Sequence, residues 1–267
     1  MAYTEKMNSA NPGCFIVMID QSQYMLDVYG INGEQKKDLA AEAVNRLLNE
    51  IIEASYDGES IKDRAFVGVI GYGKKNPSVE LILSDMISQI GGNPKRVEKV
   101  TKKISDGSGG LVEIKEDYPV WIESVAEMDA PMDDAFKRAS QLSQHWCNTH
   151  PHSFPPLVIN ITSGKTNNEF SARVEAEKLI QISNNDGNVL LFNAHISDGL
   201  KKPILFPSNK NSFNDSSSDF LFDISSQLPD VLMQEAKYFH ERVETRARGM
   251  IYNANAEIFI RLFNEGS

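Results

Sequence analysis

Three short segments carry side chains that could do chemistry together. Asp20 to Met25 has the sequence Asp-Gln-Ser-Gln-Tyr-Met, Met128 to Met132 is Met-Asp-Ala-Pro-Met, and residues 162–165 are Thr-Ser-Gly-Lys. The first and third segments follow apolar runs typical of buried strands, and the second precedes a helical pattern. Ligands of α/β sheets bind at the carboxyl ends of the strands. We therefore expect the three segments to meet there and to present hydroxyl and carboxylate groups on one surface.

A nucleophilic serine is one chemical alternative at these segments. Ser163 or Ser22 would then be the nucleophile of a hydrolase, and such a serine needs a general base within hydrogen-bond reach. No recognised spacing positions a base beside either residue. The sequence also contains neither a Gly-x-Ser-x-Gly elbow nor a His-Glu-x-x-His helix. A hydrolase is therefore the least favoured interpretation.

Histidines and Gly-Lys fragments are weaker candidates for a site. His150 and His152 have a spacing that suits two metal ligands, but no third ligand lies nearby in the sequence, so a rigid turn is favoured. His195 ends a predicted core strand and is interpreted as a strand-end residue with satisfied hydrogen bonds. The fragments at 71–74 and 164–166 lack the spacing of a nucleotide-binding loop.

The elements that must position these segments follow from hydrophobic periodicity. Short apolar runs predict strands buried on both faces, and an alternating run predicts a more exposed strand. These strands are expected at residues 14–20, 64–72, 157–162 and 189–196, and at 78–83. Apolar residues at three- and four-residue spacing predict helices at residues 38–54, 132–147, 170–182 and 230–246, with a further candidate at 254–263. This alternation predicts a doubly wound α/β sheet, mostly parallel and flanked by helices.

The segment 91–129 interrupts the alternation. Gly-Gly-Asn-Pro at 91–94 is a break, and the Arg-Val-Glu-Lys-Val-Thr-Lys-Lys-Ile run that follows is expected to form a short helix. A glycine-rich turn at 106–110 then precedes the alternating Leu-Val-Glu-Ile-Lys. We interpret this segment as a small hairpin or irregular insert, which either contacts a ligand or serves as scaffold.

The remaining stretches set the expected domain limits. Residues 203–207 are expected to form a short edge piece, and the polar residues 208–219 an ordered loop. Because no internal repeat or long linker is visible, residues 13–265 are expected to form one domain after an N-terminal tail, 1–12.

Composition and charge narrow the function classes. The chain has 267 residues, 41% of them hydrophobic and 24% charged, with a formal net charge of −10. An acidic surface repels phosphate backbones, so nucleic-acid binding is not expected. No apolar run approaches the roughly 20 residues of a membrane span, and the polar N-terminus lacks a secretory signal. We expect a cytoplasmic protein in which Cys14 and Cys147 are reduced core thiols rather than a disulfide.

The three segments together resemble a known family. Ile-Val-Met-Ile-Asp-Gln-Ser-Gln-Tyr-Met looks like the first signature of von Willebrand factor A (vWA) domains, Asp-x-Ser-x-Ser at the end of the first strand. Met-Asp-Ala-Pro-Met-Asp-Asp-Ala-Phe resembles the family's Gly-x-Thr-Pro-Met segment, and Leu-Val-Ile-Asn-Ile-Thr-Ser-Gly-Lys resembles its Ile-Thr-Asp-Gly strand end. The resemblance covers roughly residues 13–264, and further pieces, among them Val-Gly-Val-Ile-Gly-Tyr-Gly, resemble bacterial stand-alone members. It implies a vWA fold, which is doubly wound and Rossmann-like.

In that family the three motifs build a metal ion-dependent adhesion site, usually for Mg²⁺, whose shell an acidic residue of the partner completes. Carried over by position, Asp20 and Ser22 match the family pattern, and we assign them to a residual, degenerate metal site. Tyr24 stands in place of the second serine, Ala130 in place of the threonine and Ser163 in place of the second aspartate. One carboxylate and one hydroxyl are a poor ligand set for Mg²⁺.

The resemblance therefore implies a non-enzymatic protein–protein interaction module that needs no cofactor. We expect its binding surface to be formed by Gln21, Gln23, Tyr24, Asp129, Ser163 and Lys165. Some bacterial relatives are encoded beside a PPM-type phosphatase and a Ser/Thr kinase-like protein, which implies partners of those kinds in signalling or stress and defence.

A divalent-cation-dependent adhesion-type binder is the second hypothesis. It would use Asp20, Ser22 and a substitute carboxylate from Asp129, Asp133 or Asp134. Asp133 and Asp134 are expected instead to complement the positive end of the following helix.

Overall fold

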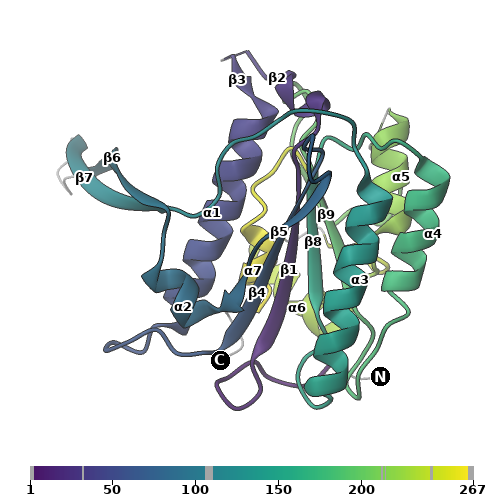
Figure 1. The fold of residues 1–267 in the computed structure, drawn as a ribbon, viewed down its shortest axis with the longest axis horizontal. Coiled ribbons are helices and arrows are strands. Elements are labelled where there is room, and N and C mark those ends of the chain that lie inside the picture. Colours follow the sequence, from purple (N-terminus) through teal and green to yellow (C-terminus); the bar gives the residue numbers. More distant parts are fainter. Residues whose placement is uncertain are drawn as a thin grey trace.

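The computed structural model describes residues 3–31, 33–105, 111–211, 213, 215–240 and 243–263. A seven-stranded sheet with the strand order β10-β11-β9-β8-β1-β4-β5 forms its centre (Figure 1). Its strands, in chain order, are β1 (Gly13–Asp20), β4 (Ala65–Tyr72), β5 (Val79–Met86), β8 (Leu157–Thr162), β9 (Leu190–His195), β10 (Ile204–Leu205) and β11 (Met250–Tyr252). The five inner strands run parallel, and the edge strands β5 and β10 are antiparallel to their neighbours.

Helices cover both faces of this sheet. They are α1 (Lys36–Ser55), α2 (Ile87–Gly92), α3 (Met132–Thr149), α4 (Glu169–Leu179), α5 (Ser216–Ile224), α6 (Asp230–Phe239) and α7 (Ile258–Arg261). Alternate residues of β1 enter two separate apolar clusters, Phe15 and Val17 on the α1 side and Ile16 and Met18 on the α3 side. Because both faces are covered, every residue of β1 is buried. The predicted doubly wound, mostly parallel α/β sheet is confirmed.

Element boundaries agree best where the sequence pattern is strongest. β8 has the predicted limits, and α1 and α3 each lie within two residues of theirs. The short helix expected after residue 94 is wrong, because Arg96–Ser105 forms strand β6. The expected loop 208–219 is partly wrong, since α5 begins at Ser216, where the Asp215 side chain accepts a hydrogen bond from the Ser218 amide.

The C-terminal third differs most from the prediction. Helix α6 ends at Phe239 and not near Arg246, and the last helix, α7, is only one turn long. The strand β11 was not predicted. It has three residues, too few to show a period in the sequence.

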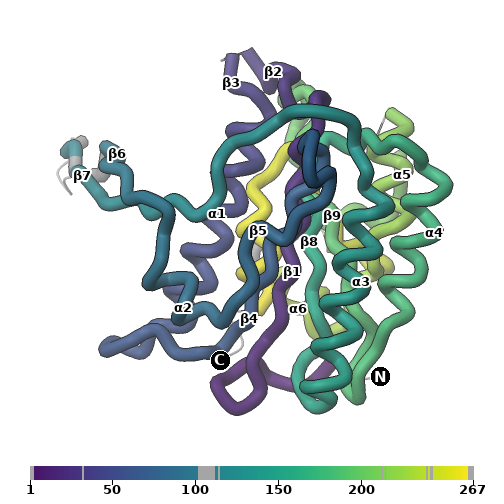
Figure 2. Tube along the Cα trace, in the orientation of Figure 1, coloured from purple at the N-terminus to yellow at the C-terminus, as the bar shows by residue number. Residues whose placement is uncertain are grey.

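The segment after α2 forms a hairpin, as one of the two predicted forms. β6 (Arg96–Ser105) pairs antiparallel with β7 (Leu111–Val120), and this two-stranded ribbon stands away from the sheet beside α1 (Figure 2). The Asn45 side chain of α1 holds the base of the ribbon: its Nδ2 donates to the Ile122 carbonyl at 2.9 Å, and its Oδ1 accepts from the Trp121 and Ile122 amides at 2.8 and 3.0 Å. The ribbon is thereby fixed to α1 at one end.

Two further small elements lie above the sheet. The 3₁₀ helix η1 (Gln23–Leu26) follows β1, and the short hairpin of β2 (Val28–Tyr29) and β3 (Glu34–Gln35) leads into α1. Gly30 has φ +63° in this turn, and its amide donates to the Asp198 carbonyl at 2.8 Å. The β2–β3 hairpin is therefore attached to the loop that follows β9.

A line of buried polar side chains crosses the α3 side of the sheet. Tyr72 Oη donates to Asn160 Oδ1 at 3.0 Å, and Asn160 Nδ2 donates to Asn193 Oδ1 at 2.9 Å. Asn193 Nδ2 in turn donates to Ser225 Oγ at 2.9 Å. Burial is the main reason that the pKa of Tyr72 lies well above its ordinary value, and the nearby Asp20 charge raises it further.

Three remaining features bear on the predictions. Cys14 and Cys147 are both buried and free, as expected. The Tyr3 amide donates to the Asp186 carbonyl at 3.1 Å, so the expected tail contacts the loop before β9. None of the helices in the described part of the chain is long and apolar enough to cross a membrane.

Candidate functional site

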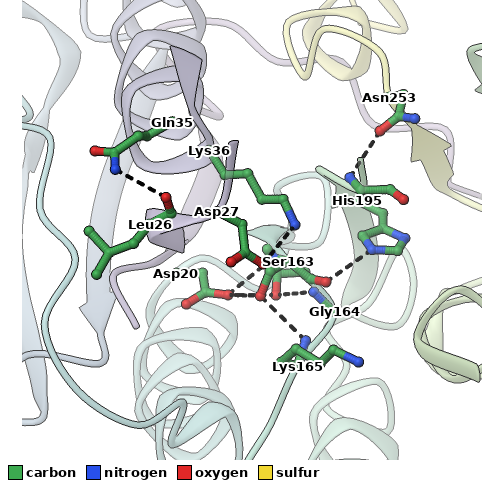
Figure 3. A network of polar contacts seen from close by, with 12 residues as sticks. Asp20, Leu26, Asp27, Gln35, Lys36, Ser163, Gly164, Lys165, His195 and Asn253 are labelled. Carbon is green, nitrogen blue, oxygen red and sulfur yellow. Dashed lines mark hydrogen bonds and ion pairs between the residues drawn. The ribbon is translucent and has the colours of Figure 1, made fainter. Parts of the chain in front are cut away.

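The ends of β1 and β8 bring two of the predicted segments together. β1 and β8 are parallel neighbours, and Ile19 is paired with Ile161. The next residues along each strand are Asp20 and Thr162, so Ser163 follows directly beside the carboxylate (Figure 3). The predicted meeting of Asp20 and Ser163 at the carboxyl ends of the strands is therefore observed.

Asp20 is fully buried and is held by four hydrogen bonds. Its Oδ1 accepts from the Ser22 amide at 3.0 Å. Its Oδ2 accepts from Thr162 Oγ1 at 3.1 Å, from the Ser163 amide at 3.1 Å and from Ser163 Oγ at 2.8 Å. Hydrogen bonds of this kind satisfy the acceptor atoms of a buried carboxylate. The carboxylate thus joins the β1 and β8 loops from inside the protein.

The loop after β1 is held against the one after β4. Gln21 N donates to the Tyr72 carbonyl at 2.7 Å. At Gly73, which has φ +111°, an added Cβ would lie 2.4 Å from the Ser22 amide nitrogen. Only a glycine permits this close approach. The packing leaves Ser22 Oγ and Gln21 Oε1 buried without a hydrogen-bond partner among the described residues.

The Met128–Met132 segment reaches the same surface by backbone pairing. Ser22 forms a parallel bridge with Met128, and the Gln23 amide donates to the Met128 carbonyl at 2.6 Å. Ala130 is fully buried, and its amide donates to Asn167 Oδ1 at 2.8 Å. All three predicted segments therefore converge, but the Met128–Met132 segment contributes only the methyl group of Ala130 at its centre.

The donor set does not fit a resident Mg²⁺ ion. Asp20 Oδ2 already accepts three hydrogen bonds, and Ala130 has no ligand atom. Among the residues that the structure describes, no group of three or more His, Cys, Asp or Glu side chains is placed to hold a metal ion. Asp133 and Asp134 lie in the first turn of α3, where Lys137 contacts both. Mg²⁺ needs near-octahedral oxygen ligands, and these residues do not supply them.

His195 is a strand-end residue with satisfied hydrogen bonds, as predicted, and its contact with the Ser163 loop is a role that the sequence did not show. It is buried at the end of β9, and its Nε2 donates to the Ser163 carbonyl at 3.0 Å (Figure 3). Its Nδ1 lies 3.0 Å from Ser218 Oγ, and Ser218 Oγ lies 2.8 Å from Asp215 Oδ2. Burial lowers the pKa of His195 to about 4, although Asp215 and the Ser163 carbonyl act in the opposite direction. His195 is thus neutral near pH 7 and positions the Ser163 loop.

The same contacts argue against a hydrolase. Ser163 Oγ donates its proton to Asp20, and His195 contacts the Ser163 carbonyl and not its hydroxyl. Ser22 Oγ has no partner in the described structure that would act as a base. A nucleophilic serine needs a base at its hydroxyl, and no histidine is placed there.

The predicted partner-binding residues divide into two groups. Gln21 and Ser163 are buried, at 2% and 5% exposure, and lie beneath the surface. The exposed group comprises Gln23, Tyr24, Asp129 and Lys165. Gln23 Nε2 donates to Asp129 Oδ1 at 3.4 Å, so these two predicted residues are in contact.

An exposed apolar surface lies beside this group, which the sequence did not reveal. We call it the apolar rim; it consists of Tyr24, Leu26, Val28, Ile31, Met128 and Leu200. Ile31 is 92% exposed and Leu200 is 69% exposed. The rim lies on η1, the β2–β3 hairpin and the loops that precede α3 and follow β9, all at one end of the sheet.

A buried lysine completes the site. Lys36, at the start of α1, is 9% exposed, and its Nζ lies 3.5 Å from Asp27 Oδ2 (Figure 3). The charges of Lys36 and of the exposed Lys165 both lower the pKa of His195. Two cationic side chains therefore lie at the end of the sheet where the carboxylate of Asp20 is buried.

Comparison with known proteins gives only distant similarity. No protein-family model matches the chain, and no curated protein matches it. The manganese-loaded TRAP protein of Plasmodium vivax is 12% identical, with 94% of this chain and 72% of that chain covered and a TM-score of 0.42. Proximal thread matrix protein 1 from the mussel byssus is 14% identical, with 84% and 43% covered and a TM-score of 0.44.

A third structure is similar over a smaller part of the chain. The vWF domain of the type V pili tip protein Mfa5 from Porphyromonas gingivalis is 11% identical, with 58% of this chain and 39% of that chain covered and a TM-score of 0.33. The chain thus spans less than half the length of this domain and of the mussel protein. Independently of these likenesses, its sheet is a seven-stranded, mostly parallel α/β sheet with a site at the strand ends.

Proposed function

We propose that this chain is a non-enzymatic, vWA-like protein–protein interaction module that binds its partner without a metal ion. Its binding face consists of the apolar rim together with Gln23, Asp129 and Lys165. Gln21, Ser22 and Ser163 support this face from below. Asp20 takes the place of a metal centre as the group that joins the loops.

The exposed apolar rim is the observation that carries the proposal. Large apolar side chains gathered at one end of a soluble fold, and rimmed by polar groups, mark an interaction surface. Tyr24 is 37% exposed and combines an apolar ring with a polar end, a combination common at the energetic centre of interfaces. The neighbouring Lys165 adds a cation, so the partner's contact segment would combine apolar and acidic side chains.

The cellular setting belongs to the same proposal. The resemblance to bacterial stand-alone vWA proteins supports a cytoplasmic role in signalling or in stress and defence. A PPM-type phosphatase or a Ser/Thr kinase-like protein is then the first partner to test. The chain would act as an adaptor or scaffold within one domain, residues 13–265.

The test is a pull-down with a purified candidate phosphatase or kinase-like protein. The double variant Tyr24→Ala, Lys165→Glu should lose the partner, and Phe170→Ala, Lys178→Glu on α4 is the matched control, because Phe170 is 77% exposed. Equal recovery by both variants would show that the binding face lies elsewhere. Recovery by the wild-type chain should be the same with EDTA as with Mg²⁺.

A cation-dependent binder is the second candidate, favoured by one observation. The buried Ser22 Oγ has no partner among the described residues, and a cation would give it one. Calorimetric titration with Mg²⁺ and Mn²⁺, with Asp20→Ala as the control, separates the two candidates. We expect no binding at millimolar metal. Saturable binding that Asp20→Ala removes would establish the cation-dependent alternative and would overturn metal independence.

A further inference from the structure

Three depressions that share lining residues lie around α1. One, of about 370 Å³, lies between α1 and the end of β7, and another, of about 530 Å³, lies between α1 and the base of the ribbon. A third, of about 230 Å³, lies between α1 and the segment that follows β11. All three are lined by Arg46, so we call them together the Arg46 groove.

The charge of this groove is strongly negative. The 370 Å³ depression is lined by the carboxylates of Glu50, Glu53, Glu116, Asp117 and Glu257 and by one guanidinium, that of Arg46. Arg46 pairs with Glu42 and lies 3.9 Å from Glu257. The cations that approach from outside, Lys99 to Asp117 and Arg261 to Glu50, form exposed pairs, which contribute little to stability. Basic side chains of a partner can therefore replace them at little cost.

The walls of the groove combine this charge with apolar surface. The 530 Å³ depression has Val100, Val120 and Ile122 among its lining residues. Asn45 holds the ribbon against α1 through its bonds to Trp121 and Ile122, so the two walls have a fixed separation at that end. Such a groove suits an extended segment whose alternate side chains face the apolar wall and the carboxylates.

An independent observation points to a ligand with a hydrogen-bond acceptor. Asn253 lines the 230 Å³ depression and is only 8% exposed. Its Oδ1 accepts from the Ser197 amide at 2.9 Å, whereas its Nδ2 is buried without an acceptor in the described structure. A backbone carbonyl of a bound segment would satisfy this amide, which otherwise carries an unmet desolvation cost.

We propose that the Arg46 groove docks a basic, extended segment of a partner protein. Lysine or arginine side chains of the segment pair with Glu50, Glu53 and Glu257, its apolar side chains contact the ribbon wall, and a carbonyl accepts from Asn253. None of its lining residues belongs to the apolar rim, so a partner can be held at two places or two partners can be held at once.

The test uses a fluorescein-labelled ten-residue peptide of alternating lysine and valine, with fluorescence anisotropy as the readout. Glu50→Gln, Glu53→Gln should weaken binding about tenfold, because two partly desolvated charge pairs are lost. The matched control is Glu169→Gln, Glu177→Gln on α4, which changes the net charge equally and should leave the affinity within about twofold of the wild type. The same peptide with glutamate for lysine should not bind.

Three results would overturn the proposal. Equal weakening by both double variants would show that attraction to the net charge alone is responsible. Binding of the glutamate peptide would show that charge complementarity is not responsible for binding. The third uses the side-chain amide signals of Asn253 in an NMR spectrum, identified by their loss in Asn253→Asp. We expect these signals to shift as the lysine peptide is added, and signals that stay fixed at saturation would exclude Asn253 from the site.

Discussion

Asp20 and the Arg46 groove use carboxylates in opposite ways. Asp20 is fully buried, and four donors from its own chain hold it. The groove instead gathers five carboxylates around one guanidinium in a single depression at the surface. A buried carboxylate needs hydrogen-bond donors from its own chain and so becomes part of the scaffold. Carboxylates at the surface can attract the basic groups of a binding partner. The carboxylate of Asp20 is thus engaged within its own chain, and we propose that binding uses groups exposed at the surface.

The largest expected effect on the free energy of unfolding comes from removing the buried carboxylate of Asp20. Asp20→Ala removes the acceptor of four hydrogen bonds and leaves the buried amides of Ser22 and Ser163 without that partner. We expect the free energy of unfolding to fall by about 3 kcal/mol, measured by urea denaturation. Ser163→Ala, which removes one donor and leaves Asp20 its other three, should cost about 1 kcal/mol. A loss below that for Asp20→Ala would mean that the carboxylate does not join the loops.

A second prediction concerns His195, the other buried group of the site. Burial lowers its folded-state pKa to about 4, below the ordinary value of 6.5. Between those values the unfolded chain binds a proton that the folded protein does not, so stability falls as the pH falls from about 7 towards 4. From pH 7 to pH 5 this single group should cost about 2 kcal/mol.

His195→Gln isolates that effect. The glutamine amide can donate to the Ser163 carbonyl as Nε2 does, but it does not titrate. Urea unfolding of the two proteins at pH 5 and pH 7 gives the difference, from which the carboxylates common to both cancel. Asp215, Lys36 and Lys165 are unchanged in both proteins. An equal pH dependence in the two would show that His195 is already protonated in the fold at pH 5.

The smallest expected effect on the free energy of unfolding comes from a substitution in the Arg46 groove. Arg46→Gln removes the guanidinium from the groove, but Arg46 and Glu42 are both nearly half exposed, so their pairing contributes little. The free energy of unfolding should change by no more than about 0.5 kcal/mol. The lysine–valine peptide should bind more tightly to this variant, because an internal competitor for Glu42 and Glu257 is gone. A large loss of stability would show that the contacts of Arg46 with Glu42 and Glu257 stabilise the fold.

The sequence predicted the core of the sheet because its pattern there is local. The apolar runs of β1, β4, β8 and β9 are buried on both faces and so need no tertiary information to be recognised. Strand β6 escaped prediction because it carries charged residues along its length, which give no apolar period. Helix α5 was hidden within a serine-rich stretch, although its Asp215 cap is a local signal that could have been found.

The part of the site that could be predicted follows from one rule, that sites of α/β sheets lie at the carboxyl ends of the strands. That rule brings Asp20 and Ser163 together, and the structure places them in direct hydrogen-bond contact. The contacts of His195 were missed because they join it to the Ser163 carbonyl and to Ser218 of the unpredicted helix α5, both distant in the chain. The apolar rim and the Arg46 groove were missed for another reason. They join residues that are far apart in the chain, and only the tertiary packing makes them neighbours.

The line of polar side chains from Tyr72 to Ser225 has a consequence for how the sheet is assembled. Asn160 is paired with Met18 on β1 and with Asn193 on β9. If β8 shifted by one residue, Asn160 would turn towards the apolar cluster on the α1 side. It would then lose its hydrogen bonds to Tyr72 and Asn193. Hydrocarbon side chains alone tolerate such a slip far better than amides do. The four hydrogen-bonded side chains thus fix the register of the strands, and the same register places Asp20 beside Ser163.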